Sequence, residues 1–240
     1  MGIWSNYREK PVCFLDVRGT LTDEPQADRD CFLAVLKELT GRWLPEDGEW
    51  NAGSIYRTFS KHRARHLSFE ESLKRVLRRA PIESGREWLT SFRREYEGLR
   101  VHTIRIRPEA APTLKLLAQA KAIGIISNGS RKRVERVLEL GKLTPYLDEK
   151  LIVDSSGAGF RKPDPRLFRL AARKAGVKAE QCVMVGDSWR RDVKGGVDAG
   201  MLPIWLRPEQ LSKPPQFIRV DSKQVAVIRR FVDLGNLAEQ

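Results

Sequence analysis

Side chains that could do chemistry follow the short apolar runs of this 240-residue sequence. Asp16 follows VCFL, Ser127 follows AIGII, and Asp187 follows CVMVG. If these runs are parallel strands, their carboxyl ends lie side by side at one edge, which is where open α/β sheets bind ligands. Lys162 and Asp192, at the starts of helical patterns, enter the same edge. We therefore expect these five side chains to converge.

Such a group of side chains suits phosphoryl chemistry. Carboxylates with few nitrogen or sulphur ligands favour Mg²⁺, which shares its coordination with a phosphate. Lysine is a compact charge that binds phosphate and offsets crowded carboxylates. The Ser127 hydroxyl and a free backbone N–H at Asn128 or Gly129 can donate to phosphate oxygens. On the residues alone, Asp16 stays open to three roles: nucleophile, metal ligand, or cap of the following turn.

The elements that position these residues alternate between apolar strands and helices. The strands are expected at 12–17, 122–126, 151–153, 182–185 and 202–206, and the helices at 108–120, 131–140, 165–175 and 191–199. Repeated strand–helix units predict a parallel sheet covered on both faces, hence an α/β, Rossmann-like core. The tail predicts one more strand at 217–220 and a closing helix over 223–234.

Residues 23–106 interrupt this alternation with helices alone. Periodic apolar residues predict helices at 30–40, 68–79 and 86–98. Ser68 and Glu71 form a capping box at the start of the second one. The predicted organisation is a core made of residues 11–22 and 107–240, with an all-helical domain inserted at 23–106.

A formal net charge of +13 is the unusual bulk property of the chain. Residues 55–108 carry 14 Lys and Arg against 6 Glu and no Asp, an excess of 8. This charge predicts an anionic partner, and we prefer the steering of a small anionic metabolite. A nucleic-acid partner stays open but is not favoured, because no nucleic-acid-binding motif accompanies the charge. Four aromatic residues that could stack bases are expected to pack in the core instead: Trp43, Trp50, Tyr56 and Phe59.

Composition indicates a cytoplasmic globular protein. The hydrophobic fraction is 41%, and residues 1–11 are polar and lack a signal-peptide core. No apolar run approaches the roughly 18 residues of a membrane span. No C-x-x-C pair is present, so Cys13, Cys31 and Cys182 are expected to be buried free thiols. A monomer and a homodimer are both compatible with the sequence.

Four segments in order carry a resemblance to a known family: FLDVRGTLTD, IISNGS, RKPDPRLF and VMVGDSWRRDVKGGVDAGM. They span residues 14–201, and each lies at a predicted strand end or helix start. The chain resembles the haloacid dehalogenase superfamily of aspartate-nucleophile hydrolases, most of which are phosphatases. Its helical insertion resembles the type-1 cap of that family, a lid that closes over the site. The resemblance implies a Mg²⁺-dependent hydrolase that acts on a small phosphorylated metabolite.

The resemblance also implies roles for single residues. Asp16 would attack phosphorus to form an aspartyl-phosphate, an ordinary case of nucleophilic catalysis. Ser127 and Lys162 would hold the phosphoryl oxygens. The ligands carried over for Mg²⁺ are Asp16, the backbone carbonyl of Arg18, Asp187 and Asp192, the last directly or through water.

Arg18 departs from the family pattern, in which phosphatases have a second aspartate two residues after the nucleophile. That aspartate protonates the leaving group and later activates water. An arginine stays protonated and cannot act as a general base, and acid–base assistance contributes about 10² to 10⁴ in rate. We expect weak or atypical phosphomonoesterase activity, unless His62 or His66 substitutes. An activated substrate such as an acyl phosphate would need little protonation, and Arg18 could then bind a second anion.

Two alternatives remain open. A catalytically impaired member with a binding or regulatory role is favoured by Arg18, whereas the retained Asp16, Lys162 and Asp187 argue against it. A true dehalogenase expels halide and needs no acid. Dehalogenases of the family, however, have a tyrosine in place of Arg18 and lack the metal pair, so GDSWRRD favours the metal-dependent branch.

Overall fold

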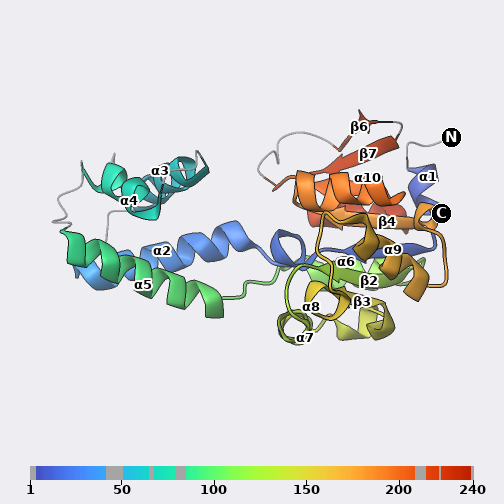
Figure 1. Cartoon of the computed structure of the whole chain (residues 1–240), viewed down its shortest axis with the longest axis horizontal. Coiled ribbons are helices and arrows are strands. Elements are labelled where there is room, and N and C mark those ends of the chain that lie inside the picture. Colours follow the sequence, from blue (N-terminus) through green and yellow to red (C-terminus); the bar gives the residue numbers. More distant parts are fainter. Residues whose placement is uncertain are drawn as a thin grey trace. The chain divides into compact units, whose positions relative to one another are not determined.

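The chain divides into two compact units in the computed structural model, which describes residues 4–41, 51–64, 68–78, 85–208, 215–221 and 223–238. The core unit comprises Met1–Asp23 and Ile106–Gln240, and the helical unit comprises Glu24–Arg105. Figure 1 labels most of the helices and strands of both units. In the described part of the chain, no helix is both long and apolar enough to cross a membrane.

The described residues of the core unit form a seven-stranded sheet with the order β3-β2-β1-β4-β5-β7-β6 (Figure 1). The strands are β1 (Val12–Leu15), β2 (Ala122–Ser127), β3 (Ile152–Asp154), β4 (Cys182–Gly186), β5 (Leu202–Leu206), β6 (Gln216–Val220) and β7 (Lys223–Ile228). Neighbouring strands are parallel throughout, except that β6 pairs antiparallel with β7. The predicted α/β class with a mostly parallel sheet is confirmed.

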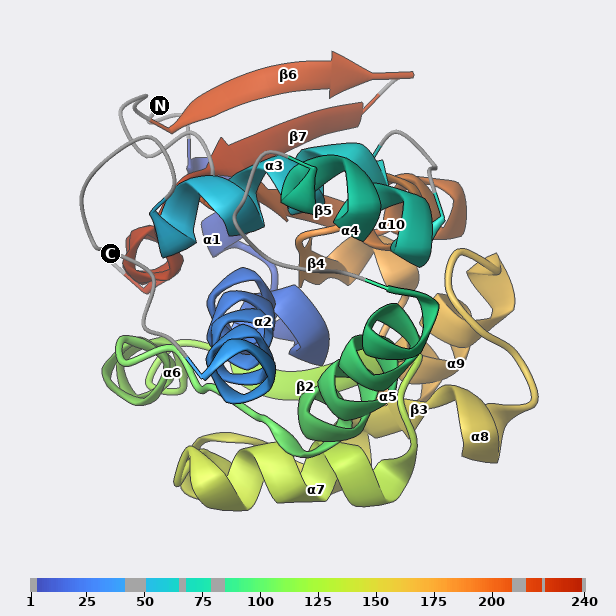
Figure 2. The same cartoon turned by 90° about the vertical axis from the view of Figure 1, so that its left-hand side faces the viewer.

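Helices cover both faces of this sheet. They are α1 (Ser5–Arg8), α6 (Ala110–Leu117), α7 (Arg131–Leu140), α8 (Ser155–Ala158), α9 (Pro165–Lys174) and α10 (Gly195–Ala199). In Figure 2, α9 and α10 lie on one side of the sheet and α6 lies on the other. Two-sided cover explains why all four residues of β1 are buried, as its unbroken apolar run predicts.

The face of the sheet that packs on α9 shows how closely the layers fit. Leu167 and Phe168 of α9 are fully buried and belong to one cluster with Phe14 and Met184. At Gly124 of β2 a Cβ would lie 2.6 Å from the Phe14 ring, so a side chain there would displace the ring. Burying a Phe or Leu side chain contributes roughly 1.5 to 3 kcal/mol, and this packing holds the central strands in place.

The predicted closing helix over 223–234 is wrong. Lys223–Ile228 forms strand β7, which pairs with β5 on one side and β6 on the other. The segment reads KQVAVI, and β-branched side chains fit a pleated, buried surface better than a helix. Helical turns occur only afterwards, over Phe231–Leu237.

The helical unit has an aromatic core of its own. Its helices are α2 (Glu24–Thr40), α3 (Ala52–Ala64), α4 (Phe69–Leu77) and α5 (Arg86–His102). The Phe32 ring lies 4.7 Å from the Phe59 ring and 5.1 Å from the Phe92 ring, centroid to centroid, and Tyr56 packs against the same cluster. Core packing of Tyr56 and Phe59 is therefore confirmed. Trp43 and Trp50 lie outside the described residues.

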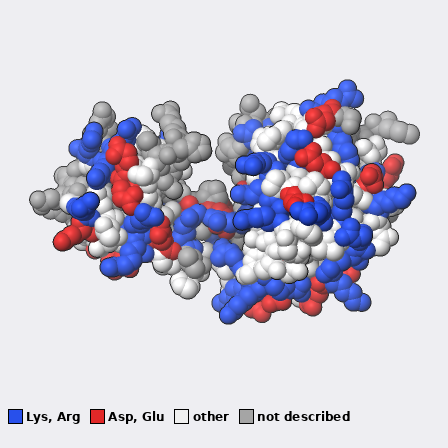
Figure 3. Space-filling view, viewed as in Figure 1, with Lys and Arg blue, Asp and Glu red and all other residues white. Residues whose placement is uncertain are grey.

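The helix cap predicted at Ser68 is present. The Ser68 Oγ accepts the Glu71 N–H at 3.1 Å, so Ser68 caps α4 as predicted. Basic side chains of the helical unit form surface pairs, including Arg75 with Glu71 at 2.7 Å and Arg93 with Glu70 at 2.7 Å. Figure 3 shows Lys and Arg interspersed with Asp and Glu on the face drawn. All three cysteines are buried free thiols, as expected.

Candidate active site

Strand β1 lies between β2 and β4: the chain runs from β1 to β2 and β3 on one side, and then crosses back to β4 on the other side of β1. Such a switch point opens a crevice at the carboxyl ends of the strands, where α/β proteins bind ligands. Asp16 directly follows β1, Ser127 ends β2, and Asp187 directly follows β4. The Asp16 N–H donates to the Val185 carbonyl at 2.8 Å, which extends the pairing of β1 with β4 up to Asp16 itself.

Asp16, Asp187 and Asp192 form a carboxylate cluster, in which one oxygen of each lies within 4.8 Å of those of the other two. Asp16 is 5% exposed and Asp192 is fully buried. Two glycines make room for the carboxylates, because a Cβ on Gly19 would collide with Asp187 and a Cβ on Gly186 would collide with Asp192. Gly19 also has φ +83°, a conformation that favours glycine. The structure thus brings together the three carboxylates that the sequence singles out.

Lys162 neutralises part of the carboxylate cluster. Its Nζ lies 2.6 Å from Asp16 Oδ1 and 2.6 Å from Asp192 Oδ1, on a side chain that is 1% exposed. Burial opposes the charge on Lys162, but the two aspartates outweigh it and raise the pKa of the lysine above its ordinary value. Asn128 fixes the backbone here: its Nδ2 donates to the Lys162 carbonyl at 3.0 Å, and its Oδ1 accepts the Lys162 N–H at 2.7 Å.

Asp187 offers a free ligand atom. Its Oδ1 is buried and has no hydrogen-bond partner among the described residues. Burial, followed by the nearby Asp16 and Asp192, raises the pKa of Asp187 to about 7. Burial likewise raises the pKa of Asp16, against the opposing effect of Lys162. A bound cation would relieve this repulsion, and a donor set of carboxylate oxygens suits Mg²⁺. The residues present therefore fit a magnesium ion.

The raised pKa of Asp187 leads to a prediction for the metal-free protein. Between about pH 4 and pH 7 the folded chain holds a proton that the unfolded chain has released, so stability falls as pH rises through this window. We expect Asp187→Asn to raise the melting temperature in EDTA at about pH 8 by several degrees, at roughly 2–4 °C per kcal/mol, with little effect at about pH 4.5. Calorimetry at both pH values measures this difference. A difference that does not change with pH would contradict it.

The loop after β2 matches its prediction in part. Ser127 is 4% exposed, and its Oγ accepts the Gly129 N–H at 3.0 Å. The Gly129 N–H is therefore engaged, which leaves the Asn128 N–H as the candidate of the two. Asn128 acts through its side chain on the Lys162 segment, a contact that the sequence does not indicate. The Ser127 hydroxyl and the Asn128 N–H remain the predicted donors to a phosphate.

Arg18 lies exposed on the turn Val17–Leu21 that follows Asp16. Its φ of −79° and ψ of 118° are open to any residue type, so the backbone does not require an arginine. The carbonyl group predicted as a metal ligand belongs to this turn.

Two residues that no sequence pattern indicates hold the backbone of the site. The buried Arg107 guanidinium donates to the Thr20 carbonyl at 2.9 Å and to the Gly19 carbonyl at 3.0 Å. The Trp205 Nε1 donates to the Asp187 carbonyl at 2.9 Å. Both are long-range contacts, and each fixes one of the two segments that meet in the carboxylate cluster.

Asp154, His62 and His66 are three further polar residues. Asp154 ends β3, but its Oδ1 accepts the N–H groups of Ser156 and Gly157 at 3.1 and 3.0 Å and so caps α8. His62 belongs to α3 in the helical unit, and His66 lies outside the described residues.

Comparison with known proteins identifies the family of this chain. A model of the haloacid dehalogenase-like hydrolase family matches residues 10–200. Glyceraldehyde 3-phosphate phosphatase of Pyrococcus furiosus is 25% identical over 202 residues, which are 83% of this chain and 82% of that protein. (S)-2-haloacid dehalogenase 4A of Burkholderia cepacia is 28% identical over 212 residues, 86% of each chain.

A solved structure shows the same fold. It is that of the HAD-hydrolase YfnB of Bacillus subtilis bound to magnesium, with a TM-score of 0.62 and 21% sequence identity. The match covers 96% of this chain and 99% of that one. The similarity therefore extends over both the core unit and the helical unit.

Proposed function

Because the chain belongs to the haloacid dehalogenase-like hydrolase family, we propose that it is a Mg²⁺-dependent phosphatase for a small phosphorylated metabolite. The observation that carries this proposal is the group formed by Asp16, Lys162, Asp187 and Asp192 at the switch point of the sheet. A buried carboxylate in contact with a buried lysine provides both a nucleophile and a charge that binds phosphate. Relatives named phosphatases support the same reaction class.

Asp16 is the proposed nucleophile. One of its carboxylate oxygens attacks phosphorus, the bond from phosphorus to the leaving oxygen breaks, and the leaving group takes the electron pair. Water then cleaves the aspartyl-phosphate and regenerates the carboxylate. Lys162 and the Ser127 hydroxyl hold the phosphoryl oxygens as the displacement proceeds.

The metal ligands are proposed to be Asp16, Asp187, Asp192 and the carbonyl of Arg18. When bound, Mg²⁺ supplies positive charge that offsets the phosphoryl oxygens and the crowded carboxylates. Lys162 alone carries one positive charge against three carboxylates, which is too little to admit a phosphate dianion as well.

Arg18 favours substrates with a good leaving group. Its guanidinium stays protonated, so it cannot protonate the leaving oxygen efficiently or activate water. An acyl phosphate releases a carboxylate, which needs no proton at neutral pH, whereas an alkyl phosphate releases a strongly basic alkoxide. We therefore place acyl phosphates ahead of alkyl phosphates among the substrates. Arg18 is also suited to bind a second anionic group.

Glu24–Arg105, the helical unit, is proposed to be the cap that selects the substrate. It holds its own aromatic core, so it can move as one body. The unit as a whole carries 16 Lys and Arg against 13 Asp and Glu, and its basic excess lies in the part after residue 55, where it would raise the local concentration of an anionic metabolite.

Two alternatives rest on specific observations. A dehalogenase is suggested by the relative of that name. Expulsion of halide, however, does not require the metal-binding carboxylates Asp187 and Asp192 beside Asp16. Chloride release from 2-chloropropionate would identify that reaction. A binding or regulatory protein is suggested by Arg18, and it would release neither chloride nor phosphate.

Metal dependence tests the proposed function directly. Phosphate release from acetyl phosphate is expected to be at least about tenfold faster with Mg²⁺ than with EDTA, because the ion offsets charge that Lys162 cannot. Asp187→Asn, which removes one ligand oxygen, should raise the Mg²⁺ concentration for half-maximal rate by about tenfold or more. Titration of the rate with Mg²⁺ measures both effects. Full activity in EDTA would refute the proposed role of the carboxylate cluster.

A further inference from the structure

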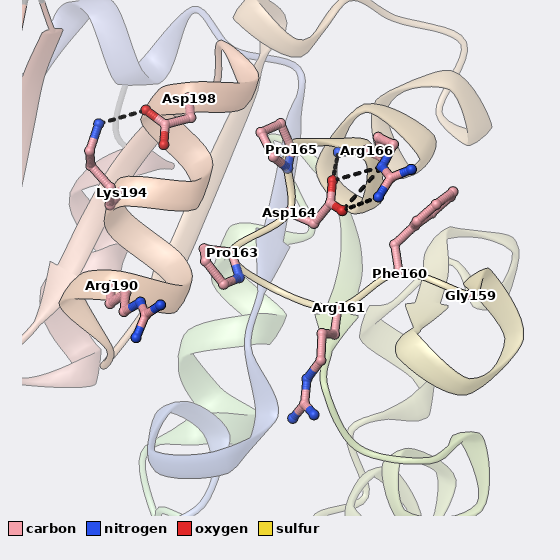
Figure 4. A pocket seen from close by; sticks show the side chains of 10 residues that line it. All are labelled: Gly159, Phe160, Arg161, Pro163, Asp164, Pro165, Arg166, Arg190, Lys194 and Asp198. Carbon is pink, nitrogen blue, oxygen red and sulfur yellow. Dashed lines mark hydrogen bonds and ion pairs between the residues drawn. The ribbon is translucent and has the colours of Figure 1, made fainter.

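A cavity lies in the core unit beside the segments that carry Lys162 and Asp192. Its volume is about 610 Å³. It is lined by residues 159–161 and 163–166 of the loop before α9 and its first turn, and by Arg190, Lys194 and Asp198 (Figure 4). None of the residues proposed above for the nucleophile, the metal or the phosphoryl oxygens lines it. The cavity is therefore distinct from the carboxylate cluster.

The walls of this cavity carry two excess positive charges. Arg166 is paired with Asp164 at 2.6 Å, and Lys194 is paired with Asp198 at 2.7 Å. These two pairs are drawn as dashed lines in Figure 4.

Arg161 and Arg190 provide the excess. Both are exposed, neither forms an ion pair with any described residue, and in Figure 4 both guanidinium groups point toward the same side of the cavity. Guanidinium groups bind phosphate oxygens in pairs with planar, charge-assisted hydrogen bonds. Two such groups in the lining give the cavity a surplus of positive charge that attracts an anionic ligand.

The remaining walls suit an organic group. The Phe160 ring forms part of the lining, with the Arg166 guanidinium 4.1 Å from its centroid, and Pro163 and Pro165 add apolar surface. Cavities of about 300–1,000 Å³ with apolar walls and a few polar groups are typical sites for small organic ligands.

The chain connects this cavity to the carboxylate cluster. Lys162 lies between Arg161 and Pro163 in sequence, but its own side chain is buried against Asp16 and Asp192. Arg190 similarly lies between Asp187 and Asp192. We propose that this cavity binds the phosphate group of a small organic anion, separate from the phosphate that reacts at Asp16. A ligand held by Arg161 and Arg190 would tie together the two segments that carry Lys162 and Asp192.

Phenylphosphonate is a suitable probe, because its P–C bond resists hydrolysis and its ring offers an apolar group to the apolar part of the lining, such as Pro163. Binding is measured by titration calorimetry in EDTA at about pH 8 and low ionic strength, where three ionised carboxylates against one lysine repel a dianion from the carboxylate cluster. We expect one phenylphosphonate to bind per chain. Arg161→Gln/Arg190→Gln should weaken binding at least tenfold, since the phosphonate loses its charge-assisted interactions with the two guanidinium groups. Inorganic phosphate should bind more weakly than phenylphosphonate.

The matched control is Lys132→Gln/Arg136→Gln, which removes two exposed charges of α7 outside the cavity. It should leave the affinity within about twofold. Equal losses in both double variants would show that only the net charge attracts the anion, and would overturn the proposal. An unchanged affinity in Arg161→Gln/Arg190→Gln, or equal affinity for the two anions, would also overturn it. No turnover is measured, so this test is independent of the proposed catalysis.

Discussion

Asp16→Asn is expected to lower the rate of phosphate release from acetyl phosphate by at least about 10³-fold, because the amide cannot attack phosphorus as a carboxylate does. The change is nearly isosteric and removes one of three crowded negative charges. Lys162 keeps Asp192 as a partner at 2.6 Å, so its buried charge stays compensated. The rate loss would therefore report chemistry and not unfolding. Single-turnover phosphate release with Mg²⁺ measures it.

Asp154→Asn is the matched control for this substitution. Asp154 also ends a strand of the sheet, but it caps α8 and lies outside the carboxylate cluster. Asparagine caps helices about as well as aspartate, so the rate should stay within about threefold of native. Mass spectrometry of acid-quenched native protein should further show a phosphoryl adduct on the peptide that contains Asp16, absent from Asp16→Asn. Comparable rates in native protein and Asp16→Asn would exclude this nucleophile.

The convergence of Asp16, Ser127 and Asp187 could be predicted because it depends only on where each strand ends and on the strands being parallel. Asp16, Ser127 and Asp187 each follow an apolar run that had to be a buried strand, and parallel strands place such ends together. The position of Lys162 could be predicted because its loop enters the same edge of the sheet. The apolar runs are local features of the sequence, and the rule for the carboxyl ends of parallel strands supplies the rest.

Contacts that depend on the packed structure could not be predicted in this way. Arg107 reaches back to the carbonyls of Gly19 and Thr20 across the whole helical insertion, and Asn128 grips the backbone of Lys162. No spacing in the sequence encodes such pairs. Strand β7 was missed for a related reason: a short buried segment of six residues has too few positions to separate helical from extended periodicity.

Arg18→Asp is expected to raise the rate of hydrolysis of an alkyl phosphate by about 10² to 10⁴, the usual contribution of general acid–base catalysis. The backbone of Arg18 is open to any residue type, and Arg107 holds the same turn through its carbonyls. Aspartate should therefore be accommodated without rearrangement. The gain should depend on the leaving group: large for an alkyl phosphate, whose alkoxide must be protonated, and about tenfold or less for acetyl phosphate, whose carboxylate needs no proton.

Arg18→Asn separates acid–base catalysis from the loss of a positive charge, since it removes the guanidinium without adding a proton donor. Under our interpretation only Arg18→Asp gains activity on the alkyl phosphate, and its rate falls on both sides of an optimum pH as an acid and a base titrate. Equal gains in both variants would mean that Arg18 hinders substrate entry by size or charge. No gain in either variant, with a native protein that releases no phosphate, would favour a binding or regulatory role for the site formed by Asp16 and Lys162. The dependence of the rate gain in Arg18→Asp on the leaving group thus decides whether Arg18 marks a phosphatase that has lost its activity or one adapted to activated phosphates.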